Sequence, residues 1–262
     1  MSKVDDRREK IISFLKTSSM LNIKVLANLL NVSTMTIRRD LEFLTEQNIV
    51  QFYHGGVVFS PHYMEKVANP NDYYLQRQTT LHKNEKNLIA QKAVEFLVPK
   101  ETIMIDSGTS MFYLANILPE NYNLTIISWA LNVIEELTHK PENSILIQGG
   151  VYHPETRMFE NNLGMDMIKN SRASKAFISA GGIHSSLGIT CPFHYEVETK
   201  RTAIKYSLES ILLIDSSKFG KVCSAHMADI TEFQAIITDS GIPAEYKEFI
   251  RSKGVQLIIA SE

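Results

Sequence analysis

From about residue 85 onward, short apolar runs of strand type alternate with helical stretches, and this alternation constrains the fold more than any other feature of the chain. Strands that are apolar nearly throughout have no solvent-facing side, so they indicate a mainly parallel sheet covered by helices on both faces. The pattern therefore predicts an α/β domain over residues 85–262. The apolar runs are TIMID, NLTIIS, SILIQGG, KAFISAGG, SILLID, FQAIITD and VQLIIAS.

The first 58 residues have a different texture, with three short helical patterns followed by two strand-like segments around His54-Gly55-Gly56. Asn31 tolerates a left-handed turn between the second and third patterns, and Ser33 stands where a helix N-cap is expected. We predict a helix, a tight turn and a second helix, followed by a β-hairpin. The expected buried residues are Ile11, Phe14 and Leu15 in the first helix, Val25, Leu26, Leu29 and Leu30 in the second, and Ile37, Leu41 and Leu44 in the third.

Three residues in this segment have the spacing of a helix-turn-helix. Ala27 supplies the small residue that a close helix crossing needs, Asn31 the turn, and Ile37 the apolar residue that is buried in the second helix of the motif. At about 100° per residue, the face of the third helix opposite Ile37 carries polar and exposed side chains. These are Met35, Thr36, Arg39 and Glu42, with Arg38 on the flank.

The outward face of the third helix suits double-stranded DNA. Hydroxyl and methyl groups match base edges, and an arginine matches a phosphate or a guanine. We expect Arg39 to read bases and Arg38 to contact a phosphate, against the alternative that both are solvated or that Arg38 pairs with Glu42. The candidate DNA-binding residues are Ser33, Thr34, Met35, Thr36, Arg38, Arg39, His54 and Gly55.

Composition limits the remaining choices. The net charge is -2, but the first 60 residues hold eight basic and six acidic side chains, so a polyanion contact is expected at that end. Two cysteines are too few for a disulfide framework or a four-thiolate metal site. The sequence has no apolar run long enough to cross a membrane and no signal-peptide pattern, which favours a cytoplasmic protein without a membrane partner.

The segment Asp106-Ser107-Gly108-Thr109-Ser110 lies between a predicted strand and a predicted helix. Ligands of open parallel sheets bind at such strand ends, and hydroxyls beside a helix N-terminus favour an anion such as a phosphate. The competing interpretation is an ordinary turn with a capping hydroxyl. Loops after other strands add candidates: Gly149, Gly150, Gly181, Gly182, Asp215 for sugar hydroxyls and Lys218 for a phosphate.

A rival local interpretation is a metal site built from His184, Cys191 and His194. Their spacing matches no standard zinc pattern, so we predict neither a metal nor a cofactor.

The stretch VLANLLNVSTMTIRRDLEFLTEQNIVQFYHGGV resembles the DeoR family of bacterial transcriptional repressors, whose signature has a VS..TIRRDL core and closes with an HGG hairpin wing. Val57 stands where the family often has alanine. The resemblance continues through EKNLIAQKA, IDSGTS, LIQGG, GITCPFHYEVETK, LIDSSKFG and IITD, and so covers nearly the whole chain. It implies a winged helix-turn-helix joined to an effector domain similar in fold to ribose-5-phosphate isomerases and coenzyme A transferases.

The resemblance also implies that a phosphorylated sugar or a related metabolite binds the second domain and changes the affinity for DNA. One departure concerns the second strand, after which the family commonly has Thr-Asn-Ser and this chain has Ser128-Trp129-Ala130. Either Trp129 reshapes the pocket for a different effector or part of the site is lost. Ser128, Trp129, Glu196 and Lys200 complete the set of candidate effector residues.

We therefore expect a DNA-binding domain over residues 1–58, a linker over 59–84 and an effector-binding and oligomerisation domain over 85–262. The main hypothesis is a repressor of a carbohydrate-metabolism operon that works as a homodimer or homotetramer, because one winged helix makes few phosphate contacts. The alternative is a sugar-phosphate isomerase with an accessory DNA-binding head, for which the sequence shows no dedicated catalytic carboxylate.

Overall fold

The computed structural model describes residues 3–17, 21–53, 56–60, 75–161 and 165–261. These residues fall into two compact units, one within Met1–Asp72 and one within Tyr73–Glu262. Across the described residues, no helix is long and apolar enough to span a bilayer.

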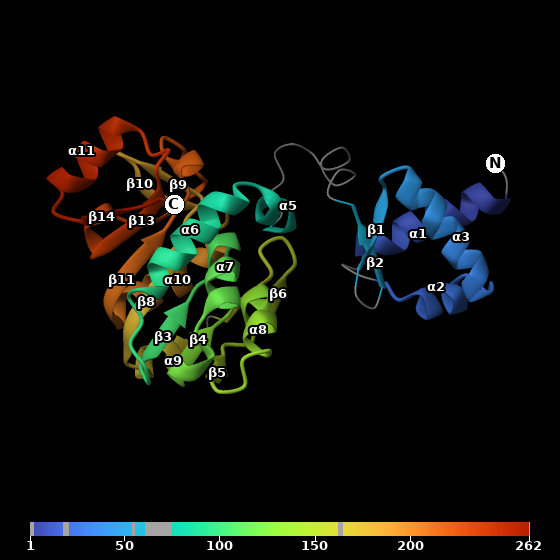
Figure 1. The fold of residues 1–262 in the computed structure, drawn as a ribbon, viewed down its shortest axis with the longest axis horizontal. Coiled ribbons are helices and arrows are strands. Elements are labelled where there is room, and N and C mark those ends of the chain that lie inside the picture. Colours follow the sequence, from blue (N-terminus) through green and yellow to red (C-terminus); the bar gives the residue numbers. More distant parts are fainter. Residues whose placement is uncertain (1–2, 18–20, 54–55, 61–74, 162–164, 262) are drawn as a thin grey trace. The chain divides into compact units, whose positions relative to one another are not determined.

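The first unit has the helices and the hairpin that the sequence predicts (Figure 1). The hairpin is antiparallel, with Val50 opposite Phe59. Asn31 has φ 51°, the left-handed conformation that lets the chain turn sharply between two helices. The elements are α1 (Lys3–Thr17), α2 (Ile23–Leu29), α3 (Thr34–Glu46), β1 (Val50–Tyr53) and β2 (Gly56–Phe59).

The core of the first unit confirms the predicted face of α3, since Ile37, Leu41 and Leu44 are all buried. The prediction for α2 was half wrong. Val25 is 47% exposed and Leu29 is 55% exposed. The seven-residue helix instead turns Leu26 and Ala27 into the core, together with the partly buried Ile23 and Leu30.

The second unit is built on a seven-stranded sheet in which every neighbouring pair is parallel. Its mixed α/β architecture confirms the predicted fold class. The strands, in spatial order, are β14 (Gln256–Ala260), β13 (Ala235–Asp239), β11 (Ser207–Leu213), β8 (Ala173–Ser179), β3 (Thr102–Ile105), β4 (Thr125–Ser128) and β5 (Ser144–Ile147).

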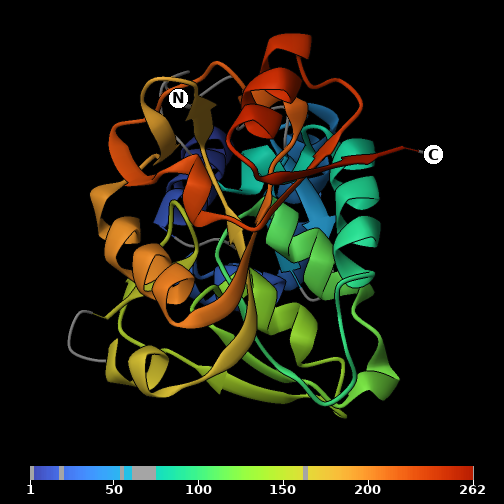
Figure 2. The same cartoon turned by 90° about the vertical axis from the view of Figure 1, so that its left-hand side faces the viewer.

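Helices cover both faces of this sheet, and Figure 2 shows the green α7 and the orange α10 on opposite sides of it. Side chains alternate along each strand. Ile103 and Ile105 of β3 therefore pack in one apolar cluster, and Met104 packs in the other. The first cluster includes α6 (Lys83–Val94), α7 (Thr109–Ile117) and α8 (Leu131–Leu137), and the second includes α9 (Met165–Asn170), α10 (Val197–Lys205) and α11 (Ala244–Ser252).

One strand departs from the expectation of burial on both faces. β5 is an edge strand, and its Leu146 and Ile147 are 41% and 49% exposed. Several elements were not predicted because they are too short to show a period. They are the hairpin β6 (Val151–His153) and β7 (Met158–Glu160), and a small sheet of β9 (Gly182–His184), β10 (Gly188–Cys191) and β12 (Ala225–Ala228). The short helix α5 (Leu75–Thr80) lies within the predicted linker.

The order of the strands shows where a ligand-binding crevice is expected in this sheet. From β3 the chain proceeds through β4 to β5 in one direction, whereas from β8 it proceeds through β11 to β13 and β14 in the other. The connections therefore diverge between β3 and β8, which lie side by side. In open parallel sheets, ligands bind beyond the carboxyl ends of the strands at such a switch point.

Candidate functional sites

The amino-terminal half of α3 is the first candidate site. The Ser33 hydroxyl accepts a hydrogen bond from the backbone N–H of Thr36 at 3.1 Å, which confirms the predicted cap. Met35 is 61% exposed, and Thr34, Arg38 and Arg39 are exposed as well. A capped helix end thus presents a methyl, a thioether and two cations to the surroundings. His54 and Gly55, also predicted to contact DNA, lie outside the described residues.

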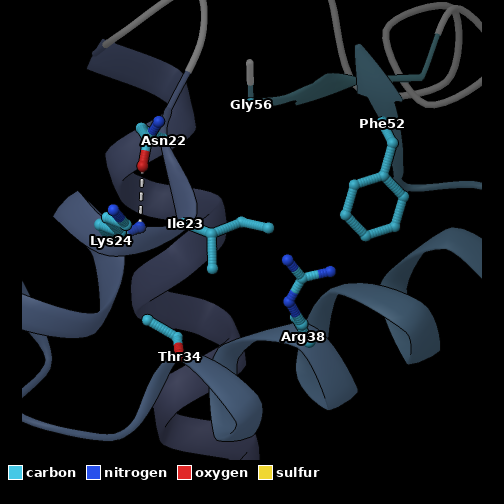
Figure 3. Close-up of a pocket in the computed structure, with 7 residues that line it drawn as sticks. All are labelled: Asn22, Ile23, Lys24, Thr34, Arg38, Phe52 and Gly56. Atoms are coloured by element: carbon cyan, nitrogen blue, oxygen red, sulfur yellow. Dashed lines mark hydrogen bonds between the residues drawn. The ribbon is translucent and has the colours of Figure 1, made fainter. Parts of the chain in front are cut away.

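A groove of about 390 Å³ runs beside this helix end. Arg38 reaches from α3 toward the part of the groove that Ile23 and Phe52 line (Figure 3). The groove has two cations, Lys24 and Arg38, and no carboxylate among its lining residues, so it is suited to an anion such as a DNA phosphate. Its lining residues are Asn22, Ile23, Lys24, Thr34, Arg38, Phe52 and Gly56.

Sequence reasoning missed Asn22, Lys24 and Phe52. Asn22 caps α2, and its side chain accepts from the N–H of Lys24 at 2.8 Å. This bond fixes the start of α2 at the edge of the groove. Phe52 belongs to β1 of the hairpin and is 47% exposed. The capping asparagine was readable from the sequence, but the position of the hairpin against α3 was not.

Asp40, which follows Arg38 and Arg39 in the sequence, has a structural role. Asp40 is 2% exposed, and its two oxygens accept from Arg7 Nε at 2.5 Å and from Arg8 Nε at 3.1 Å. The Arg8 guanidinium also lies 3.6 Å from the centre of the Phe43 ring. Asp40 of α3 therefore connects α3 to α1 through its bonds with Arg7 and Arg8.

Arg38 and Arg39 stay available for a ligand. In the described part of the chain, neither forms an ion pair, and the alternative pairing of Arg38 with Glu42 is not found. Their charge is not neutralised by Asp40, because that carboxylate is already paired with two arginines of α1.

The second candidate site lies at the switch point between β3 and β8. A cavity there is formed by the loop after β3, by the end of β8 and the loop after it, by residues around the start of α10, and by three more distant segments. Five predicted effector residues line it: Ser107, Gly108, Gly181, Glu196 and Lys200. The others that line it are Leu75, Thr156, Ser179, Ala180, Cys191 and Pro192.

Lys200 is the charged centre of this cavity. Its side chain is 1% exposed, and its ammonium pairs with Asp106 and lies 3.5 Å from Glu196 Oε2. Burial opposes the charge, but the two carboxylates outweigh it and raise the pKa of Lys200, so the ammonium is retained. The wall of the cavity therefore carries a buried ion pair between Lys200 and Asp106, with Glu196 beside it.

Asp106 is fully buried and holds the cavity together. Its oxygens accept from the Ser179 N–H at 2.9 Å, from the Ser179 hydroxyl at 3.1 Å and from the Trp129 indole N–H at 3.2 Å. Trp129 is itself fully buried and does not line the cavity. It supplies a donor at the position where the resemblance led us to expect an amide. The contacts of Asp106 in the structure thus orient Lys200 and Ser179, and an effector contact by Asp106 stays a prediction.

Two glycines of the cavity leave no room for a side chain. A Cβ on Gly108, whose φ is +117°, would lie 2.6 Å from Ser179 Oγ. A Cβ on Gly181 would lie 2.6 Å from Cys223 Sγ. Glycine at these two positions therefore lets the loops pack closely against Ser179 and Cys223.

Burial raises the pKa of two other groups that line the cavity. Burial raises the pKa of Glu196 above its ordinary value, against the opposing effect of Lys200. Burial also raises the pKa of the Cys191 thiol to about 12, so the thiol is protonated and poorly nucleophilic at neutral pH. No set of three or more His, Cys, Asp or Glu residues within the described ranges is arranged to hold a metal ion.

The remaining predicted effector residues lie near the cavity or away from it. Thr109, Ser110 and Ser128 are buried but do not line it. Asp215 accepts from the N–H and the hydroxyl of Ser217. The Lys218 ammonium donates to Gln78 Oε1 at 3.3 Å. Gly149, Gly150 and Gly182 are also absent from the lining, so effector contacts by these residues stay predictions.

Comparison with known proteins covers both units. Residues 7–62 match the sequence profile of the DeoR-like helix-turn-helix domain, and residues 81–240 match that of the DeoR C-terminal sensor domain. The deoxyribose operon repressor of Escherichia coli strain K12 is 29% identical over 254 residues, which are 97% of this chain and 98% of that protein. The glycerol-3-phosphate regulon repressor of the same strain is 29% identical over 255 residues, 97% of this chain and 98% of that one.

Among solved structures, ribose 5-phosphate isomerase A of Methanocaldococcus jannaschii matches with a TM-score of 0.39 at 12% identity. The match covers 52% of this chain and 54% of the isomerase. A likeness at this level carries no information about activity.

Proposed function

Because the chain belongs to the DeoR family of transcriptional regulators, we propose that it represses an operon of carbohydrate metabolism and that a phosphorylated sugar or a related metabolite changes its affinity for DNA. The repressors of the deoxyribose operon and the glycerol-3-phosphate regulon, which are similar over nearly their whole length, support this class of target. A protein with this role acts in the cytoplasm, where the DNA is.

The observation that carries the proposal is the position of Lys200. An ammonium that is buried and paired with Asp106 lies at the switch point of a parallel sheet, beside the Ser107 hydroxyl and two glycines of the cavity lining. This set of groups is suited to an anionic, hydroxyl-bearing molecule. The family is one of regulators, so such a molecule is proposed as an effector.

The DNA contacts are proposed for the exposed start of α3 and for the groove beside it. Thr34, Met35 and Arg39 would meet base edges, and Arg38 and Lys24 would meet phosphates. Because a single unit offers few cations, we propose a homodimer or homotetramer that binds repeated half-sites.

A mobility-shift titration tests the DNA part. The full chain is titrated against a labelled fragment from upstream of its own gene and against a scrambled fragment of equal length, at several salt concentrations. We expect saturable binding to the upstream fragment that is tighter by about 10³-fold or more, the usual range for specific recognition. Binding that does not distinguish the two fragments would contradict the proposal.

A ligand panel tests the effector part. Ribose 5-phosphate, deoxyribose 5-phosphate, glycerol 3-phosphate and glucose 6-phosphate are added to the protein bound to the DNA, with the unphosphorylated sugars and inorganic phosphate as controls. We expect one phosphorylated compound to change DNA affinity by about 5- to 150-fold, the usual range of allosteric coupling. If none does at millimolar concentration, the phosphorylated-sugar effector is wrong.

One observation favours a second candidate function. Glu196 is a buried carboxylate with a raised pKa that lines the cavity, which is what a general base for sugar-phosphate isomerisation needs. Incubation of the protein with each phosphate of the panel, followed by chromatography of the products, separates the two functions. Turnover that is lost in Glu196→Gln would establish an isomerase.

A further inference from the structure

One wall of the effector cavity comes from the segment at the start of the second unit. Leu75 is the first described residue after position 60, lines the cavity and is only 3% exposed. Its N–H donates to the carbonyl of Glu155 at 2.8 Å, next to Thr156, which also lines the cavity. Leu75 therefore closes the cavity together with the turn between β6 and β7.

The other end of α5 is held by two side chains of the helices that cover the sheet. The Tyr113 hydroxyl of α7 donates to the carbonyl of Thr79 at 2.9 Å. The Lys86 ammonium of α6 donates to the carbonyls of Gln78 at 2.5 Å and Leu81 at 2.7 Å. These bonds all go to backbone carbonyls at the end of α5, so they hold the segment whatever side chains it carries.

Lys86 is an unusual group to use for this purpose. It is 2% exposed, and burial lowers its pKa to about 8, with Lys218 acting in the same direction and Asp215 and Glu85 opposing. A second lysine is engaged as well, because Lys218 donates to the side chain of Gln78. The lysine that sequence analysis assigned to a phosphate is thus occupied by α5.

The closed cavity is too small for the proposed ligand. Its volume is about 20 Å³, the space of roughly one water molecule. Sites for small organic ligands are typically about 300 Å³ or more. A wall must therefore move before a sugar phosphate can enter. Among the walls of the cavity, α5 is a six-residue helix that is too short to be stable without the contacts described above.

We propose that α5 is a strap: with Leu75 in the cavity it keeps the effector site closed, and binding of a phosphorylated sugar requires the strap to leave. This inference rests on the proposed function, since it concerns how the effector reaches the same cavity. Departure of the strap also frees Lys218 from Gln78. In the sequence, residues 61–74 connect the strap to the DNA-binding unit, so a strap that moves on binding couples the cavity to that unit.

The strap predicts that the apparent affinity for the effector is reduced by the population of the closed state. Weakening the strap should then raise the affinity. Tyr113→Phe removes one bond to Thr79 without enlarging the cavity, and we expect binding to tighten by about 3- to 10-fold, which corresponds to one ordinary hydrogen bond. Leu75→Ala should tighten binding more. Leu81→Ala is the matched control, because Leu81 is 45% exposed and does not line the cavity.

The experiment uses isothermal calorimetry on the full chain and on these variants, with ribose 5-phosphate, glycerol 3-phosphate and inorganic phosphate as probes. Hydrogen exchange of peptides that cover residues 75–81 is measured in parallel, and we expect faster exchange when a sugar phosphate is bound. In the absence of any probe, Leu75→Ala should also move the DNA affinity toward the value that the wild-type protein has with the probe.

The outcomes separate the strap from the proposed function. If a sugar phosphate binds the wild type and the variants equally, with unchanged exchange at 75–81, the strap is wrong and the effector stands. If neither the wild type nor Leu75→Ala binds a sugar phosphate, the effector proposal fails and the strap fails with it. If all three variants including Leu81→Ala change affinity alike, the effect is general loosening, and the strap is again wrong.

Discussion

The indole N–H of Trp129 donates a hydrogen bond to Oδ1 of Asp106 at 3.2 Å, and both residues are fully buried. The bond joins the end of β4 to the end of β3, next to Ser107, which lines the candidate effector cavity. Asp106 in turn pairs with Lys200, the only cation among the described residues that line the cavity. The sole tryptophan of the chain therefore acts on the cavity through Asp106.

Replacing Trp129 by phenylalanine should lower the free energy of unfolding by about 2–6 kcal/mol. The change removes a donor to a buried carboxylate and leaves unfilled volume, each of which costs about 1–3 kcal/mol. Urea unfolding followed by far-ultraviolet circular dichroism measures it. Phe177→Leu, a loss of ring volume at a fully buried site of the same sheet, is the control and should cost less. A loss in Trp129→Phe no larger than in the control would show that the indole bond contributes little.

Residues close in sequence were predicted well, and residues brought together by strand order were not. Ile37, Leu41 and Leu44 were recognised because helical spacing is a local property. The same rule failed for Val25 and Leu29, because a seven-residue helix gives too few turns to distinguish two adjacent apolar stripes.

The lining of the candidate effector cavity was likewise predicted only where the signal is local in the sequence. Ser107 and Gly108 were predicted from the strand end that precedes them. Ser179 and Leu75 were missed, since nothing local indicates that β8 lies beside β3 or that α5 covers the crevice between them. Asp40 was missed for the same reason, because its partner Arg7 is 33 residues away.

Asp40→Asn should destabilise the first unit by about 3 kcal/mol. Breaking a buried ion pair costs about 3–5 kcal/mol, and the lower end applies because Arg7 and Arg8 are about one-fifth exposed. Differential scanning calorimetry of the full chain at neutral pH measures the shift. Operator affinity should fall in parallel, because α3 loses its tie to α1.

Glu42→Gln is the matched control for Asp40→Asn. Glu42 lies on the same helix, is exposed and should change stability by no more than about 0.5 kcal/mol. If both variants unfold like the wild type, Asp40 does not stabilise the contact between α1 and α3.

Glu196→Gln should stabilise the protein at neutral pH and not at pH 4. The pKa of Glu196 is raised from its ordinary 4.5 in the folded chain, so between 4.5 and the raised value the folded state binds more protons than the unfolded state. Stability of the wild type therefore falls as pH rises through this window, and the fall is retained above it. Glutamine keeps the acceptor for the Phe193 N–H and carries no charge. Urea midpoints of both proteins from pH 4 to pH 8 test this, and a gain that is equal at all pH values would contradict it.

Replacing Arg38 and replacing Arg39 should change DNA binding in different ways. Arg38 lines the groove with Lys24, so Arg38→Ala should weaken binding to operator and random DNA alike and reduce the slope of log affinity against log salt by about 1. Arg39→Ala should instead reduce the preference for operator over random DNA, by about 1–3 kcal/mol for one lost base contact. Lysine provides the control for each position. Arg38→Lys keeps the charge that a phosphate needs and should restore most of the affinity, whereas Arg39→Lys loses the planar fork that reads a guanine and should not restore the preference. Restoration at both positions, or at neither, would show that the two arginines share one role.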